Sequence, residues 1–314
     1  MRVSNALVTR SITSRLQEAQ RALLDAQQRA TTGRRVNVVS DDPPAGAAVM
    51  QLGGALRALE QYGRNVGAVR TRLDAEDAAL GQLTDLLTRA RELGIAANTD
   101  TVGVAERRVI GLEVRQLVEQ ALALGNTRVG DEYLFGGHAA DRPPFDPALA
   151  AQVPPFAVLD GLGAPVARGE RQVEVAAGQT VRGAHAGATV FVDTGVLGGL
   201  QALADALDPG GATPPRPLPA DQRGDVAAAL TALDAAFSAV QGHVGEVGAR
   251  QNQADAVAVG VEALRATYTQ QRSDLAEVDM EQALTDMVQR QTAYQAALLA
   301  SSRIMGLSLA DYLR

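Results

Sequence analysis

The chain contains few side chains of the types that carry out enzyme chemistry. Its three histidines are His138, His185 and His243. Helices and loops that bind metal ions present histidines and carboxylates at short, fixed spacings. We interpret all three histidines as isolated surface or loop residues without a partner at such a spacing. The sequence therefore predicts no metal site, and it shows no pattern typical of a Ser-His-Asp triad.

Two adjacent carboxylates, Asp41 and Asp42, could act as a general acid–base pair or hold a cation. Pro43 follows them, and proline is favoured at the first position of a helix. An acidic residue just before that position can accept hydrogen bonds from the free backbone amides of the first turn. We therefore interpret Ser40, Asp41, Asp42 and Pro43 as a helix cap motif.

The composition excludes several classes of protein. All 29 basic residues are Arg, and without Lys there is no P-loop lysine and no Schiff-base chemistry. Cys is absent as well, which excludes thiolate sites and disulfides. The net charge of −7 argues against general nucleic-acid binding, and no apolar run reaches the roughly 18 residues of a membrane helix. We expect no cofactor, no nucleic acid and no membrane insertion.

The elements that position these residues are predicted to be mainly helices. Apolar residues recur at alternating steps of four and three from Ile12 to Ala30, which is the spacing of a helix-packing stripe. Thr32-Gly33 ends this helix, and a second long helix is predicted from about Ala45 to Gly94. A third helix is predicted at 110–124.

The middle of the chain has a different character, because it is rich in Gly and Pro. Alternating side chains predict strands at 172–175 and 189–192, each bounded by glycines. A short helix is predicted at 197–207 and a proline-rich linker at 208–219. We interpret this region as a small β-rich insertion.

The carboxyl flank is again periodic and predicts helices at about 221–270 and 280–305. Long helices gain most of their stability by packing against another element, so we expect the two flanks to pair antiparallel and bring the termini together. The predicted fold class is mainly α. It is a long antiparallel helical rod, or coiled-coil-like bundle, made from both chain ends and carrying a small β-rich inserted domain.

Three parts are expected along the chain. Residues 1–40 and 279–314 form an assembly domain of paired terminal helices, residues 41–139 and 221–278 a helical rod domain, and residues 140–220 the β-rich insertion with its short helix and linker. Two thin helices bury too little apolar surface to offset their chain entropy, so we expect the terminal pair to need neighbours. The assembly seam is predicted at seven positions, Ile12, Leu16, Leu23, Leu284, Met287, Tyr294 and Leu298.

Four motifs lie in the flanks and at the entry to the insertion. They are Thr32-Gly33-Arg34 followed by Ser40-Asp41-Asp42-Pro43, the Gly130–Gly137 segment with its Tyr133-Leu134-Phe135 core, the Gly245–Asn252 segment, and Leu307–Leu313. Together these motifs resemble the flagellin superfamily and, within it, the hook-filament junction proteins of the hook-associated protein 3 type. Ser-Asp-Asp-Pro and the ending favour the junction branch over the flagellins.

The resemblance implies a secreted structural protein of the extracellular bacterial flagellum, exported through the flagellar type III apparatus. It implies a homo-oligomer ring between flagellin and a preceding hook-associated junction protein, and an export chaperone that binds the C-terminal region. The expected function is therefore a hook-filament junction adaptor and not an enzyme.

Two alternatives stay open from the residues. A flagellin, the filament subunit, has the same helical flanks. A cytoplasmic coiled-coil scaffold belongs to another class, but it needs neither the glycine-rich insertion nor the matched terminal motifs. An α-helical enzyme requires a constellation of polar residues that the sequence does not display.

Overall fold

The computed structural model describes residues 2–99, 102–208 and 222–312, and within it the chain forms two compact units. The terminal unit comprises Met1–Leu59 and Ala263–Arg314, and the central unit comprises Glu60–Glu262. The expected three-part division stays a prediction, because the units do not test it. The expected proline-rich linker lies, beyond Asp208, outside the described residues.

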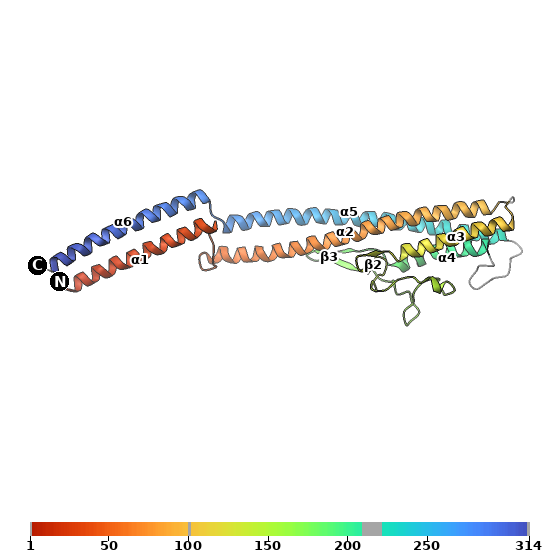
Figure 1. Ribbon diagram of the computed structural model, residues 1–314, viewed down its shortest axis with the longest axis horizontal. Helices are drawn as coiled ribbons and strands as arrows, with labels where there is room; N and C mark the ends of the chain where they lie inside the picture. The colour runs from red at the N-terminus through yellow and green to blue at the C-terminus, as the bar shows by residue number, and fades with distance from the viewer. Residues whose placement is uncertain (1, 100–101, 209–221, 313–314) are drawn as a thin grey trace. The chain divides into compact units, whose positions relative to one another are not determined.

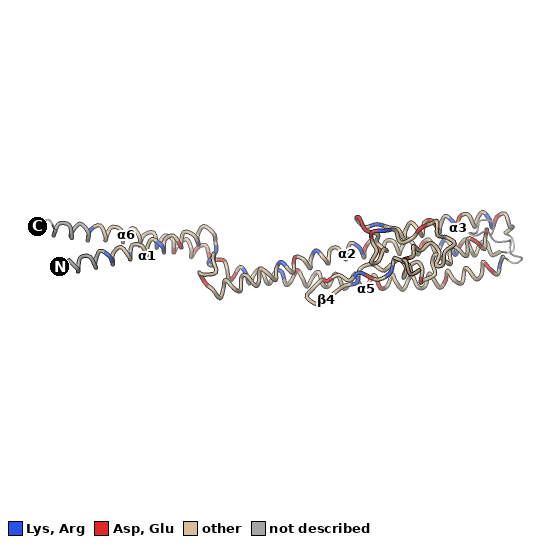
Figure 2. The backbone as a smooth tube through the Cα atoms, turned by 90° about the horizontal axis from the view of Figure 1, so that it is seen from below, with Lys and Arg blue, Asp and Glu red and all other residues tan. Residues whose placement is uncertain are grey.

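In the terminal unit, helices from the two chain ends lie side by side. Helix α1 (Arg2–Thr32) and helix α6 (Met280–Tyr312) run antiparallel in both views (Figures 1 and 2). Small residues such as Ala26 and Ala283 are buried between them, with 4% and 6% exposure. A stripe of alanines lets two helices approach closely. The pairing of the chain ends that the sequence predicted is therefore confirmed.

The central unit is organised by the greater part of two long helices, α2 (Pro43–Ala97) from Glu60 onward and α5 (Gln222–Ala276) as far as Glu262. Pairs of polar side chains connect the two helices at several points along their length. From one pair to the next, the residue number on α2 increases by the same amount as the residue number on α5 decreases. This relation fixes an antiparallel register. The pairs are Arg70 with Asp255, Asp74 with Gln251, Thr84 with Gln241, and Arg91 with Asp234.

The apolar core of the central unit lies beneath these polar pairs. Leu73, Leu80, Leu83 and Leu87 of α2 are fully buried and follow one another at helical spacing. Helix α3 (Val104–Gly125) and helix α4 (Val196–Leu207) add to this core and contact each other. Acidic and basic residues are interspersed along the described helices (Figure 2).

Helix α4 is held at its carboxyl end by a buried carboxylate. Asp208 is 4% exposed, and its Oδ2 lies 2.7 Å from Arg115 Nη1 on α3. The Arg115 guanidinium also donates to the Asp208 carbonyl oxygen. This paired arrangement satisfies a charge that would be costly to bury alone.

Two small antiparallel sheets complete the central unit. Strands β1 (Arg128–Val129) and β2 (Glu132–Tyr133) form one, and β3 (Gln172–Ala176) and β4 (Gln179–Arg182) form the other. A short 3-10 helix, η1 (Pro147–Leu149), lies between the sheets in the sequence. The first predicted strand, at 172–175, corresponds to β3.

The second predicted strand, at 189–192, is wrong. Residues Ala188–Asp193 form the π-helical turn η2. Val190 and Phe191 are adjacent and both buried, whereas a half-buried strand would place neighbours on opposite faces. A short apolar run bounded by glycines does not distinguish a strand from a buried helical segment, and here the surrounding core selects the helix.

The Tyr133–Gly137 motif enters the core where the chain leaves β2. Leu134 and Phe135 are buried, and the Phe135 ring meets the Phe191 ring edge-on at 5.2 Å. Gly137 has a φ of +61°, and a Cβ atom there would lie 2.5 Å from the Arg168 carbonyl oxygen. The motif therefore combines an aromatic anchor with a glycine whose conformation and close approach exclude larger residues.

No described helix carries a stretch that is both long and apolar enough to cross a bilayer.

Replacement of the aromatic anchor should destabilise the central unit. We expect Phe135→Ala to lower the free energy of unfolding by about 3–5 kcal/mol, because it removes a buried ring and leaves a cavity. Chemical denaturation followed by circular dichroism measures this change. Leu162→Ala is the control, since Leu162 is 95% exposed. An equal effect of both variants would contradict the assigned core.

Candidate functional site

The predicted assembly seam divides into two groups in the terminal unit. Ile12, Leu16 and Leu23 on α1 are half-buried, as are Met287 and Tyr294 on α6. Leu284 and Leu298 differ, because they are 48% and 40% exposed. One group therefore lies near the contact between α1 and α6, and the other lies on a face that this contact leaves open.

That open face carries further apolar side chains. On α6, Leu284 and Val288 are separated by about one helical turn, and Leu298 and Leu299 follow nearly three turns further along the helix. Val288 is 56% exposed and Leu299 is 65% exposed. On α1, Leu24 is 55% exposed. We call these five residues, four on α6 and one on α1, the outer apolar stripe. Exposed apolar side chains at helical spacing, such as the four on α6, are typical of a helix that packs against another chain.

The turns that follow α1 and α5 are joined by backbone hydrogen bonds. The amide of Arg35 donates to the Ala276 carbonyl oxygen at 2.7 Å, and the amide of Val278 donates to the Gly33 carbonyl oxygen at 3.0 Å. The Arg35 guanidinium donates to the Leu275 carbonyl oxygen at 2.8 Å. These hydrogen bonds connect the segment before α2 to the end of α5 within the terminal unit.

The residues predicted as a helix cap motif lie in the first of these turns. Asp42 Oδ1 accepts from the Ala45 amide at 3.1 Å, and Pro43 is the first residue of α2. Asp41 Oδ2 accepts from the amides of Asn37 and Val38 at 2.9 and 3.0 Å. Ser40 is exposed beside them. Asp42 thus accepts from an amide in the first turn of α2, whereas Asp41 accepts from amides of the turn that precedes the helix.

These hydrogen bonds change the acidity of both carboxyl groups. The Val38 amide, followed by the Asn37 amide, holds the pKa of Asp41 below its ordinary value. The Ala45 amide, followed by the Arg35 guanidinium, holds the pKa of Asp42 below its ordinary value. The ionised forms are therefore the ones that the folded turn favours.

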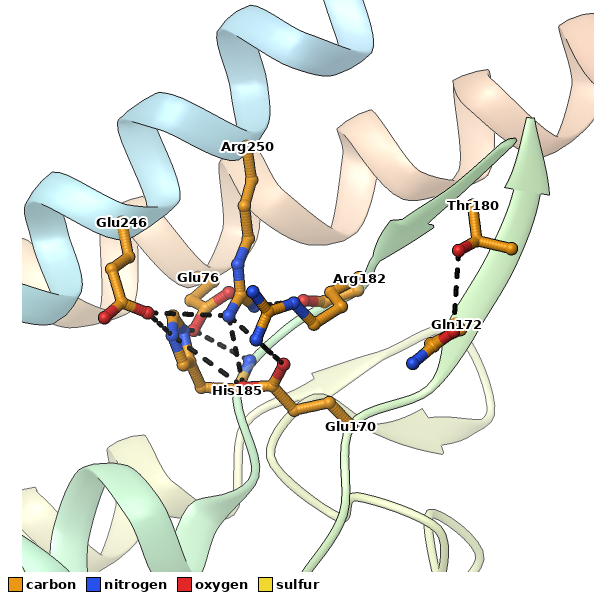
Figure 3. Close-up of polar contacts among 9 residues, drawn as sticks. Glu76, Glu170, Gln172, Thr180, Arg182, His185, Glu246 and Arg250 are labelled. Carbon is orange, nitrogen blue, oxygen red and sulfur yellow. Dashed lines mark hydrogen bonds and ion pairs between the residues drawn. The ribbon is translucent and has the colours of Figure 1, made fainter. Parts of the chain in front are cut away.

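A second polar site lies in the central unit, where His185 is enclosed by carboxylates (Figure 3). His185 is 1% exposed and follows β4. Its Nδ1 lies 2.6 Å from Glu76 Oε1 on α2, and its Nε2 lies 2.9 Å from Glu246 Oε2 on α5. The Glu76 carboxylate also accepts from the His185 amide at 3.0 Å. One imidazole thus connects two long helices.

Arg250 completes this polar cluster on α5. It is 7% exposed, and its Nη2 lies 3.1 Å from both oxygens of Glu170. Its Nη1 donates to the Gly183 carbonyl oxygen at 2.7 Å. Figure 3 shows the guanidinium beside His185 and between Glu246 and Glu170. The buried positive charge is therefore compensated by a carboxylate and a carbonyl group.

The pKa values of His185 and of the nearby His243 shift in opposite directions. Burial lowers the pKa of His185, but the hydrogen bonds and charges of Glu76 and Glu246 outweigh burial and raise that pKa above its ordinary value. Burial and then the charge of His185 lower the pKa of His243. The hydrogen bond from His185 lowers the pKa of Glu246.

The interpretation of His185 and His243 as isolated residues is wrong. Their ring centroids lie 4.8 Å apart, and both lie near Glu246. One signal was present in the sequence, because His243 and Glu246 are three residues apart and share a helix face. His185 comes from a distant loop, so no local spacing indicated it. His138, by contrast, is exposed.

These features define a class of mainly α proteins whose two chain ends pair and leave apolar side chains open to a neighbour. Models of the bacterial flagellin N-terminal and C-terminal helical regions match residues 3–140 and 230–313. The chain belongs to the flagellin superfamily.

The chain is similar to members of the junction branch over most of its length, and to flagellins over shorter segments. Flagellar hook-associated protein 3 of Escherichia coli is 25% identical over 295 residues, which cover 89% of each chain. The structure of a flagellar hook-associated protein from Vibrio parahaemolyticus is similar with a TM-score of 0.63 and 20% identity, over 76% of this chain and all of that one. FlgL of Xanthomonas campestris gives a TM-score of 0.56 and 17% identity, over 71% and 99%. The two structures support the fold.

Removal of the capping carboxylates should weaken the protein in a pH-dependent manner. Because the pKa of each carboxyl lies below its ordinary value of 3.8 in the folded chain, its contribution is present above that value and is lost as the pH falls through the folded pKa. We expect the double variant Asp41→Ala/Asp42→Ala to unfold at a lower temperature than the parent at pH 7.

Circular dichroism melts at pH 7 and at about pH 2 test this expectation. The difference between parent and variant should be largest at neutral pH and should shrink in acid. Asp131→Ala is the control, since Asp131 is an exposed residue of the central unit. A difference that is the same at both pH values would contradict the role of the charges.

Proposed function

We propose that this chain is a structural subunit of the bacterial flagellum that joins a preceding hook-associated protein to the flagellin filament. The observation that carries the proposal is the antiparallel pair of terminal helices with its outer apolar stripe. The relatives named as hook-associated protein 3 and FlgL support the junction position.

The outer apolar stripe supports an assembly role by a simple energetic argument. Apolar surface contributes about 25 cal/mol for each Å² removed from water, and within the monomer these side chains remain partly in water. A neighbouring helix that covers Leu284, Val288 and Leu299 would recover this free energy. The predicted seam thus has an inner group that serves the monomer and an outer group available to a second chain.

The finer features of this function are also proposals. We infer that copies of the chain form a ring, with flagellin on one side and the preceding hook-associated junction protein on the other. An export chaperone binds the C-terminal region before the protein leaves the cell, and the assembled protein lies outside the cell. We propose that the role is mechanical and not enzymatic.

A flagellin is the alternative within the same family. It must bind its own kind head to tail without limit, whereas an adaptor reserves its two ends for unlike neighbours. The similarity to hook-associated protein 3 extends over 89% of both chains, which favours the adaptor. A cytoplasmic coiled-coil scaffold is disfavoured by the match to both flagellin helical regions.

A charge on the outer apolar stripe should block assembly and leave the monomer folded. We expect Leu298→Asp to change the free energy of unfolding by no more than about 1 kcal/mol, because the side chain is 40% exposed. Incorporation into flagella should fall sharply, since the interface would bury an unpaired charge. Circular dichroism and electron microscopy measure the two effects.

Leu162→Asp provides the matched control, because Leu162 is 95% exposed in the central unit. It should assemble normally. Motile flagella that contain the Leu298→Asp chain at parental levels would show that this part of the stripe does not contact a neighbour.

Deletion of the gene separates the junction role from the filament role. We expect hooks without filaments and flagellin released into the medium, because export continues while nothing anchors the first filament layer. The purified protein should form only short assemblies when filament seeds are added. Growth of the purified protein into long filaments, or loss of flagellin secretion in the deletion strain, would show that the assignment to the junction branch is wrong.

A further inference from the structure

The polar cluster around His185 lies in the central unit, whereas the proposed contacts with neighbouring chains lie in the terminal unit. It brings together two histidines and a glutamate from separate segments of the central unit. One possible ligand atom from each of His185, His243 and Glu246 lies within 4.8 Å of the other two. The chain has no Cys, so these nitrogen and oxygen atoms form the kind of mixed donor set that zinc and similar ions accept.

The position of Glu76 is what a metal-binding histidine requires. Its carboxylate is fully buried and accepts from both Nδ1 and the amide of His185. A proton held on Nδ1 leaves Nε2 free to bind a metal, and a carboxylate behind the ring is the usual partner of such a histidine. His185 Nε2 lies 2.9 Å from Glu246 Oε2, so a metal ion bound to both atoms would replace the proton that they share in this hydrogen bond.

Two buried atoms of the cluster make no hydrogen bond within the described part of the chain. They are Oε2 of Glu76 and Nδ1 of His243. Buried polar atoms are normally satisfied, and an unsatisfied atom costs free energy. A cation in the cluster would stabilise the Glu76 carboxylate, and a neutral His243 has a lone pair to offer.

The balance of charge points in the same direction. Glu76, Glu170 and Glu246 provide three carboxylates, and the buried guanidinium of Arg250 is engaged mainly by Glu170. Glu76 and Glu246 hold the His185 ring between them. A divalent cation that displaces the proton from His185 Nε2 would supply positive charge to the same two carboxylates. Arg250 Nη2 lies 3.5 Å from Glu246 Oε2, but the second oxygen of that carboxylate remains available.

The cluster also has a route of entry and room to adjust. The Glu246 side chain is 58% exposed and His243 is half-buried, so both can shift while His185 stays fixed. Ligand atoms bound to zinc at about 2.0–2.1 Å lie roughly 3.4 Å apart in a tetrahedron. The side chains on α5 must therefore move inward by about an ångström, which small torsional changes provide.

We propose that His185, His243 and Glu246 form a binding site for a divalent transition metal ion of the zinc type, with Glu76 as the positioning residue behind His185. The ion would link α5 to the loop after β4, and through Glu76 to α2. Metal binding to the folded state adds to its stability, so occupancy would strengthen the central unit.

Titration of the purified full-length protein with Zn²⁺ tests the proposal. Isothermal calorimetry should show one site per chain, and excess Zn²⁺ should raise the temperature of unfolding. Mg²⁺ at the same concentration should do neither, because it prefers oxygen ligands. Substitution with Co²⁺ should give the visible absorption bands of a tetrahedral site with nitrogen ligands.

The variants are chosen so that loss of folding cannot imitate loss of binding. We expect His243→Gln to weaken Zn²⁺ binding at least tenfold and to abolish the Co²⁺ bands, with unfolding in the absence of metal close to that of the parent. Glu246→Gln should act similarly. His138→Gln is the matched control, because His138 is exposed and lies outside the cluster.

Three results would overturn the proposal. One is the absence of Zn²⁺ binding to the folded parent protein, and another is equal binding by the parent and His243→Gln. The third is loss of binding in His138→Gln. If a lower pH stabilises the protein and Zn²⁺ does not, His185 holds a proton and not a metal ion between its carboxylates.

Discussion

The antiparallel register of α2 and α5 is the constraint on which the central unit depends. Polar pairs at several levels hold this register, and it places Glu76 opposite the turn of α5 that carries Glu246 and Arg250. A slip by one helical turn would displace one helix by about 5.4 Å along the other. His185 could not then contact carboxylates from both helices, and the leucine stripe of α2 would lose its partners.

Much of the architecture was predictable because helical periodicity is a local signal. The end of α1 and the start of α2 follow from a glycine after Thr32 and a proline after Asp42. Other bounds were less accurate: α3 begins at Val104, before the predicted 110, and α5 ends at Ala276, beyond the predicted 270. Segment 189–192 was mispredicted because its burial depends on the surrounding core. The His185 cluster depends on a contact between a loop and two distant helices, so of its members only the spacing of His243 and Glu246 was visible in the sequence.

The terminal unit and the central unit differ in how completely they bury their apolar side chains. In the central unit, large side chains such as Leu80 and Phe191 are fully enclosed, so the fold carries its own core. In the terminal unit, small residues close the contact between α1 and α6, and larger ones such as Leu284 remain partly in water. A chain built in this manner is stable in one part and, as we propose for its role, depends on neighbours in the other.

The turns of the terminal unit are connected chiefly through main-chain atoms. Arg35 and Val278 donate their amides, while Gly33 and Ala276 accept through their carbonyl groups. Hydrogen bonds of this type do not depend on side-chain identity, so they place little constraint on which side chains occupy these positions. Gly33, with a φ of +67°, is the exception. Divergent relatives can therefore retain this connection while sharing few side chains around it.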